Sequence, residues 1–308
     1  LLEALALVLH EGGFEKAAHS LHLTQSAVSQ RVRLLEERAG RPLLVRGVPL
    51  RPTEAGQALL RHYRQVRLLE DDLHGDPEID LGLDQNGGPD SASATGKVAF
   101  RPLPLAVNAD SLAIWFLDAL APLARSRRLL LDLVVDDQER THALLVQGEV
   151  AGCLSTRAEP LRGTRSTRLG IMPYTCCAAP GFARQWFPRG IHAATVFAAP
   201  AVLFNRKDEV HDAFLCAELG LGLEVLPPYP RHYVPSSTKF VDAIRAGLAY
   251  GMIPLPQAAP CFASGELLDL TPGRALPVEL FWHQWDLASG LMDEVLAALQ
   301  RGAETVLR

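Results

Sequence analysis

A short helix joined by a tight turn to a longer one, near the start of the chain, constrains its fold more than any other feature. Residues 15–21 are predicted to form a short helix, and His22 and Leu23 leave room only for a tight connection. Thr24 follows as an N-cap, and Gly40 suits the left-handed conformation that ends a helix. This order predicts a helix-turn-helix unit whose second helix can enter the major groove of DNA.

The predicted helix after Thr24 has one apolar face and one polar face. Val28, Val32 and Leu35 recur at helical spacing, whereas small polar residues and arginines occupy the other side. Short donors and acceptors can approach base edges, and arginines can reach phosphates or guanine. Residues 41–51 predict two short strands that form a wing beside the groove. The candidate DNA-binding residues are Thr24, Gln25, Ser26, Ser29, Gln30, Arg31, Arg33, Arg46 and Arg51.

A long helix is predicted over residues 53–74, directly after the winged helix-turn-helix of residues 1–56. Its larger apolar residues are spaced three or four apart, which is typical of a coiled-coil seam and predicts a linker and dimerisation helix. Glu70 stands where a strict heptad would place an apolar residue, so the seam is short. The seam residues are Leu59, Tyr63, Val66, Leu69 and Leu73.

Charge is distributed unevenly along the chain. The whole chain has a formal charge of −5, but residues 25–67 contain nine arginines against three glutamates, a net +6. A basic stretch beside a larger acidic body indicates contact with DNA phosphates. No apolar run approaches the ~20 residues that span a bilayer, so no membrane partner is expected. Five cysteines without a CxxC spacing favour a reducing cytoplasm and argue against a zinc site or any other metal site.

The second part of the chain predicts an α/β body. Residues 75–96 are rich in Gly, Pro, Asp and Ser, which predicts a flexible hinge insertion. From residue 97 to 308 strand-like and helix-like stretches alternate, as in open, mostly parallel sheets covered by helices. We expect two lobes, lobe I at about 97–170 and 268–308 and lobe II at about 171–267.

The N-terminal motif is similar to the winged helix-turn-helix of the LysR-type transcriptional regulators. The similarity covers most of the first 60 residues. It implies that the helix predicted after Thr24 is the recognition helix that binds DNA. The matching residues are Ala17-Ala18, Leu21, Thr24–Ser29, Leu35-Glu36, Gly40, Pro42–Leu44, Arg46 and Pro52–Gly56.

The body resembles the basic-amino-acid-responsive branch of that family, the ArgP/LysG type. The resemblance implies two Rossmann-like lobes of the type 2 periplasmic-binding kind, with a small-molecule cleft between them. It also implies a homodimer through the linker helix, often a homotetramer, with promoter DNA and RNA polymerase as partners. Residues 77–96 depart from the family, which has a shorter hinge. The matching stretches are 107–123, 148–156, 208–215, 252–257, 264–273 and 282–285.

Ligands of open α/β sheets gather where strands end and helices begin. A strand ending at Val107 and a helix opening after Pro235 supply such positions. Hydroxyls and free N–H groups there could hold an α-carboxylate, while Asp110, Asp208 or Glu209 could pair with a cationic side chain. Ordinary helix capping is the alternative role for these residues. The candidate effector-binding residues are Asn108, Asp110, Ser111, Ser155, Asp208, Ser236, Ser237 and Thr238.

Together these features predict a cytoplasmic DNA-binding regulator. The resemblance implies that it senses lysine or arginine and controls basic-amino-acid export or metabolism. No catalytic dyad is evident, so neither an enzyme nor a bound cofactor is expected. One alternative keeps the regulator and changes the effector to another small metabolite. A distant alternative is an α/β binding protein or hydrolase whose N-terminal helices serve only for oligomerisation.

Overall fold

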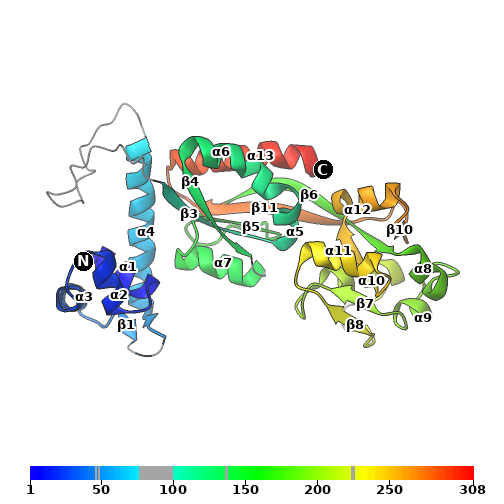
Figure 1. Ribbon diagram of the computed structural model, residues 1–308, viewed down its shortest axis with the longest axis horizontal. Helices are drawn as coiled ribbons and strands as arrows, with labels where there is room; N and C mark the ends of the chain where they lie inside the picture. The colour runs from blue at the N-terminus through cyan, green and yellow to red at the C-terminus, as the bar shows by residue number, and fades with distance from the viewer. Residues whose placement is uncertain (46, 48, 76–99, 136–137, 223–225) are drawn as a thin grey trace.

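The protein is elongated, with a small helical domain at one end and a two-lobed α/β body along the rest of its length (Figure 1). The computed structural model describes residues 1–45, 47, 49–75, 100–135, 138–222 and 226–308. Arg46 and nearly all of the predicted hinge insertion at 75–96 therefore lie outside the described residues. Within the part that is described, no helix combines the length and the apolar character needed to cross a membrane.

The helical domain, here called the reader, is built from α1 (Leu2–His10), α2 (Phe14–Ser20) and α3 (Gln25–Ala39). Thr24 caps α3, because its side-chain oxygen accepts the backbone N–H of Ala27 at 3.2 Å. Gly40 ends the helix in the left-handed region at φ 67°. The apolar faces of the three helices meet in one core, whose fully buried members include Leu5, Val8, Ala17, Val28 and Val32.

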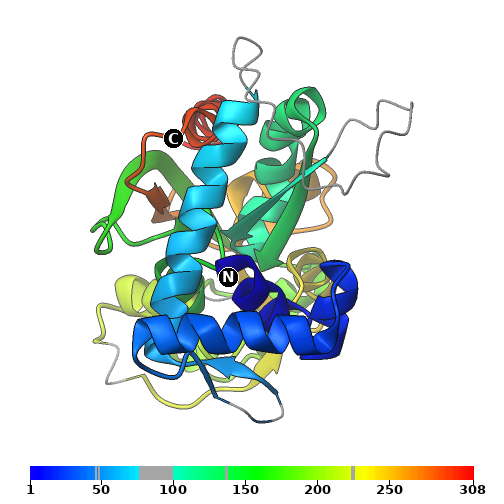
Figure 2. The same cartoon turned by 90° about the vertical axis from the view of Figure 1, so that its left-hand side faces the viewer.

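A small wing projects beside α3. It consists of β1 (Leu44–Val45) and β2 (Arg51–Pro52), which pair antiparallel. Glu36 holds the start of the wing against α3, since its Oε1 accepts the backbone N–H of Leu43 at 2.8 Å. In Figure 2 the wing hangs below the blue helix α3, which crosses the lower end of the cyan helix α4.

Helix α4 (Glu54–Gly75) extends from the reader to the body. Thr53 caps it, accepting the N–H of Gly56 at 3.1 Å while donating its hydroxyl to the carbonyl of Pro42 at 2.8 Å. Leu60 belongs to the reader core and Leu68 to the core of the body, so one helix is anchored in both domains.

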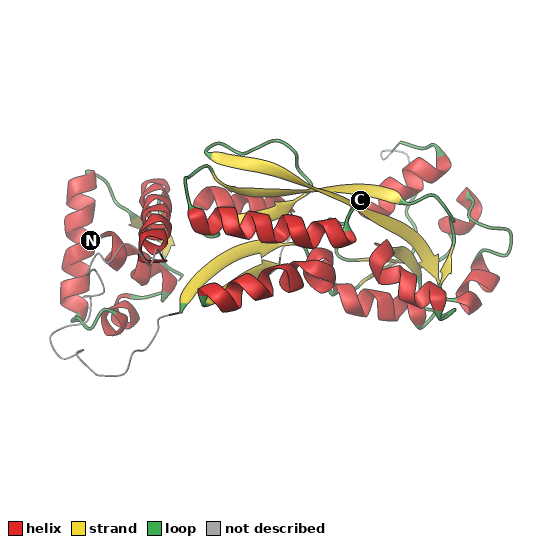
Figure 3. Cartoon of the chain, turned by 90° about the horizontal axis from the view of Figure 1, so that it is seen from above, coloured by secondary structure: helices red, strands yellow, loops and turns green. Residues whose placement is uncertain are grey.

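One mixed sheet runs through both lobes of the body. Its strand order is β4-β3-β5-β11-β6-β9-β7-β8, with β10 paired to β6. The α/β class is confirmed, but the expectation of mostly parallel sheets is wrong, because β6 and β11 pair antiparallel from one lobe into the other (Figure 3). The strands are β3 (Arg101–Val107), β4 (Leu129–Val135), β5 (Gly152–Ser155), β6 (Thr164–Ala178), β7 (Ala201–Leu203), β8 (Arg231–Tyr233), β9 (Tyr250–Pro254), β10 (Leu268–Asp269) and β11 (Leu276–Trp285).

Helices cover both faces of this sheet, and a core that is continuous across the lobes lies between them. The stretch from α5 through a π-helical segment to α6 is one uninterrupted helix in space. The helices are α5 (Ala109–Ser111), the π-helical segment (Leu112–Phe116), α6 (Leu117–Arg127), α7 (Gln138–Gln147), α8 (Pro180–Trp186), α9 (Ala193–Val196), α10 (Val210–Leu219), α11 (Ser237–Arg245), α12 (Leu255–Ala263) and α13 (Gly290–Val306).

Gly56, in the first turn of α4, allows close contact between the helix and the wing. A Cβ at this position would lie 2.0 Å from the carbonyl oxygen of Leu43. We predict that Gly56→Ala destabilises the reader by about 1–3 kcal/mol, because the overlap with backbone outweighs the helix propensity gained. Gly181→Ala in α8 is the control, since its Cβ would meet nothing within 4 Å. Urea unfolding followed by circular dichroism measures both, and equal stabilities would contradict the prediction.

Candidate functional site

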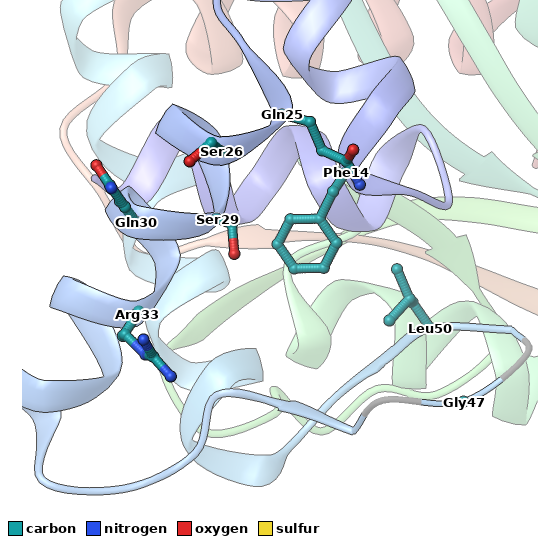
Figure 4. A pocket seen from close by; sticks show the side chains of 8 residues that line it. All are labelled: Phe14, Gln25, Ser26, Ser29, Gln30, Arg33, Gly47 and Leu50. Atoms are coloured by element: carbon teal, nitrogen blue, oxygen red, sulfur yellow. The ribbon is translucent and has the colours of Figure 1, made fainter.

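The exposed face of α3, the start of α2 and the wing together enclose a hollow on the reader surface (Figure 4). Five of the predicted DNA-binding side chains line it, and all five are exposed. Phe14, Gly47 and Leu50 complete the lining. The five predicted residues are Gln25, Ser26, Ser29, Gln30 and Arg33.

The other predicted DNA-binding residues that the structure describes lie outside this lining. Thr24 is used as the cap of α3, although it remains exposed. Arg31 is exposed on α3 and Arg51 on β2, both outside the lining. Neither Phe14 nor Leu50 was among the predicted residues; each is a lone apolar residue beside a glycine or proline turn, which is a weak signal on its own.

The lining of the hollow combines apolar, polar and cationic side chains. Phe14 and Leu50 supply the apolar contacts, while Ser29 and Gln30 offer short hydrogen-bonding groups and Arg33 a cation. Major-groove recognition uses this mixture, because base edges present donors and acceptors and thymine presents a methyl group. The reader therefore has the chemistry needed to contact bases, and exposed arginines on α3 and β2 are of the type that binds phosphates.

A second site lies in the body, where a cavity of about 630 Å³ opens between the lobes. This volume is within the range of small-molecule sites in proteins. Four of the predicted effector-binding residues line the cavity, namely Asn108, Asp110, Asp208 and Ser237. They come from the start of α5 in lobe I and from the starts of α10 and α11 in lobe II.

Asp110 connects the two lobes across this cavity. Its Oδ2 accepts the hydroxyl of Tyr174 at 2.6 Å, and its Oδ1 accepts the hydroxyl of Ser237, also at 2.6 Å. Gln257 extends the chain of contacts by donating its Nε2 to Ser237 Oγ at 3.3 Å. Burial raises the pKa of Tyr174, and the neighbouring Asp110 carboxylate raises it further. The phenol is therefore a donor, and both Asp110 oxygens are engaged by protein groups.

Asp208 gives the cavity a largely buried carboxylate. Its two oxygens accept the backbone N–H groups of Phe204 at 2.8 Å and Val210 at 3.0 Å. Burial raises the pKa of Asp208, these two hydrogen bonds lower it, and the carboxylate of Asp110 raises it again. Glu209 adds a further acid to the lining, opposed by the cation of Lys207. The cavity therefore favours a ligand that brings positive charge.

The remaining predicted effector-binding residues serve local structure. Ser111 is buried beside its cap Asn108, and Ser155 Oγ accepts the backbone N–H of Arg157 at 3.0 Å. Ser236 caps α11 at 3.5 Å from Lys239 N, and Thr238 is exposed; none of these four lines the cavity. The lining residues that the sequence analysis missed include Thr156, Tyr174, Asn205, Lys207 and Gln257.

No group of three or more histidine, cysteine or acidic side chains in the described ranges is arranged to hold a metal ion.

Family comparisons cover both domains. Residues 1–57 match the family described as "Bacterial regulatory helix-turn-helix protein, lysR family", and residues 101–304 match the "LysR substrate binding domain". The chain is 43% identical to the transcriptional regulator ArgP of Pseudomonas aeruginosa over 301 residues, covering 96% of this chain and 94% of that protein. It is also 43% identical to ArgP of Serratia proteamaculans over 307 residues, covering 100% and 97%.

The chain also matches solved structures over its full length. ArgP from Mycobacterium tuberculosis matches with a TM-score of 0.84 and 33% identity, covering 100% of this chain and 97% of that one. Full-length LysG from Corynebacterium glutamicum with bound effector Arg matches with a TM-score of 0.76 and 30% identity, covering 100% and 98%.

His211 is buried and directly follows Val210, which lines the cavity. Its ring packs on Tyr229 at 5.7 Å and on Tyr250 at 5.0 Å between centroids, and neither ring nitrogen has a hydrogen-bond partner. Burial lowers the pKa of His211 to about 3, and the cation of Arg231 contributes to the shift. The folded protein therefore holds this imidazole neutral at pH values where the unfolded chain protonates it.

We predict that acid destabilises the fold through His211. A histidine with a lowered folded pKa costs stability as pH falls from about 6.5 toward 3, since only the unfolded state takes up the proton. The cost is about 3 kcal/mol at pH 4.5. His211→Phe keeps the aromatic contacts and is expected to flatten the pH dependence of the unfolding free energy. Denaturant titrations at several pH values test this, and parallel curves for the two proteins would exclude it.

Proposed function

Because the chain belongs to the LysR family of bacterial transcriptional regulators, in the branch that includes ArgP and LysG, we propose that its cleft binds a basic amino acid. Lysine or arginine occupying the cleft would then alter how the reader engages promoter DNA. The protein is a DNA-binding regulator and not an enzyme. The acidic lining of the cleft, which includes the largely buried carboxylate of Asp208, is the observation that carries this proposal.

The cavity suits both ends of such a ligand. Asp208 and Glu209 can pair with a guanidinium or ammonium group, which would offset the cost of keeping a carboxylate buried. Helices α10 and α11 begin at Val210 and Ser237, both lining residues, so two positive helix ends face the cavity and favour an α-carboxylate. The relative LysG, which was solved with arginine as its effector, supports the same ligand class.

The proposal extends to the assembly of the protein, its place in the cell and its target genes. We propose a homodimer through the seam of α4, with further assembly to a tetramer, because paired readers can contact two half-sites of one promoter. A regulator of this kind acts in the cytoplasm, where its DNA and RNA polymerase are found. A response to lysine or arginine fits the control of genes for basic-amino-acid export or metabolism.

We predict that calorimetric titration detects binding of arginine or lysine but not of leucine. Asp208→Asn keeps an oxygen for one backbone N–H and removes the charge, so it should weaken arginine binding at least tenfold. Asp242→Asn is the matched control, because Asp242 is a half-exposed residue of α11 outside the cavity lining that pairs with Lys239. Absence of heat with either basic amino acid at millimolar concentration would indicate another metabolite as effector.

We predict that Ser29→Ala combined with Arg33→Ala weakens promoter binding by about tenfold to a hundredfold, because both side chains line the hollow of the reader. Loss of a phosphate contact should also reduce the salt slope by about 0.9. Gel-shift titrations at several salt concentrations measure both effects. Arg184→Ala on lobe II removes the same charge far from the reader and serves as control. Unchanged affinity in the double variant would reject α3 as the recognition helix.

A further inference from the structure

One face of the linker helix α4 is fastened to lobe I of the same chain. Three of its side chains donate hydrogen bonds to the carbonyls at the end of α7 and just beyond it. The pairs are Gln57 Nε2 with the oxygen of Gln147 at 2.7 Å, Arg61 Nη1 with that of Val146 at 3.1 Å, and Arg64 Nη1 with that of Gly148 at 3.0 Å.

These contacts match the electrostatics of helix ends. The last carbonyls of a helix have no partner within it and form its negative end, so cations bind there favourably. Burial lowers the pKa of Arg64, and the nearby Glu149 carboxylate opposes that shift. At the far end of α4, Asp72 Oδ1 accepts the N–H of Leu291 at 3.2 Å, in the first turn of α13. The linker helix thus presents cations to one helix C-terminus and an anion to a helix N-terminus.

Besides these hydrogen bonds, α4 also packs closely against lobe I. Leu68 is buried among the core residues of the body. Gly148 faces α4 directly, because a Cβ there would lie 2.9 Å from Arg61 Cα. Gly148 also has a φ of +74°, which glycine adopts without strain. A side chain at this position would push the helix away from the lobe.

The docking residues Gln57, Arg61, Arg64, Leu68 and Asp72 recur at intervals of three or four and therefore share one face of α4. The predicted dimer seam starts at Leu59, two residues after Gln57, which places it about 200° around the helix. The seam and the docking face thus lie on opposite sides, and one helix can serve a second copy and its own lobe together.

A short stretch of chain, buried from Val150 to Ser155, joins the docking contact to the cavity. Gly148 is followed by β5, whose four residues are all buried, and Thr156 directly after β5 lines the cavity. We propose that the docking face of α4 is the contact that couples the effector cleft to the reader. A change at the cleft that shifts β5 also shifts the end of α7, and with it the helix that carries the reader. The coupling rests on the proposed function, whereas the docking itself does not.

Two glycine variants test the docking. Gly148→Ala and Gly220→Ala introduce the same strain, because both residues follow a helix at positive φ, but only Gly148 has α4 against it. Hydrogen–deuterium exchange by the full-length protein without ligand should rise at least tenfold across residues 57–68 and 141–148 in Gly148→Ala and stay unchanged there in Gly220→Ala. Equal exchange in the two variants overturns the docking.

Coupling is measured as the ratio of promoter dissociation constants with and without saturating arginine. In Gly148→Ala and in Arg61→Ala combined with Arg64→Ala, this ratio should fall toward 1, while arginine affinity stays within about threefold of the parent. Arg67→Ala, on an exposed face of the same helix beside Glu70, should keep the parental ratio. An unchanged ratio in the undocked variants overturns the coupling. A parent protein whose promoter affinity responds to neither arginine nor lysine would instead refute the proposed function, with the exchange result still deciding the docking.

Discussion

The antiparallel pairing of β6 with β11 is the interaction on which the rest of the body depends. It runs from Tyr174 opposite Leu276 to Thr164 opposite Trp285, with a register shift between Leu280 and Phe281. One half of the pair completes the sheet of lobe I and the other half that of lobe II, so the lobes share backbone hydrogen bonds. The cavity lies against this pair, and Tyr174 and Val278 from the two strands both line it.

The reader could be predicted from the sequence because its signals are local. The caps of α3 and α4 are Thr24, Gly40 and Thr53, and each acts within a few residues of its own helix. The pairing of β6 is different, since residues 164–173 bind a strand more than a hundred residues later and carry no comparable local pattern. An alternation of strands and helices suggested parallel sheets, whereas the strands that connect the lobes run antiparallel.

The difference between local and long-range signals also decides which cavity residues could be predicted from the sequence. Asp110 and Ser237 could be found because they begin helices, and helix starts are visible in a sequence. Tyr174 lies within a strand and Gln257 within α12, so only the tertiary fold reveals that they reach the cavity. At β5 the cavity is lined by Thr156 and not by Ser155, because neighbouring residues at a strand end point to opposite sides. Which of these two neighbouring residues faces the cavity depends on where β5 sits in the folded sheet, and the sequence alone does not show this.

Asp110 has a hydroxyl partner for each of its oxygens, and these partners tie lobe I to lobe II. The oxygens of Asp208 instead accept backbone N–H groups of its own lobe. The side chain that joins the lobes is thus different from the side chain best placed to meet a ligand's charge. Under the proposed function, substitutions of Asp208 and Glu209 would alter which molecule is bound without removing the hydrogen bonds of Asp110 that hold the lobes together. The fold therefore separates the side chains that would select a ligand from the side chain that connects the lobes.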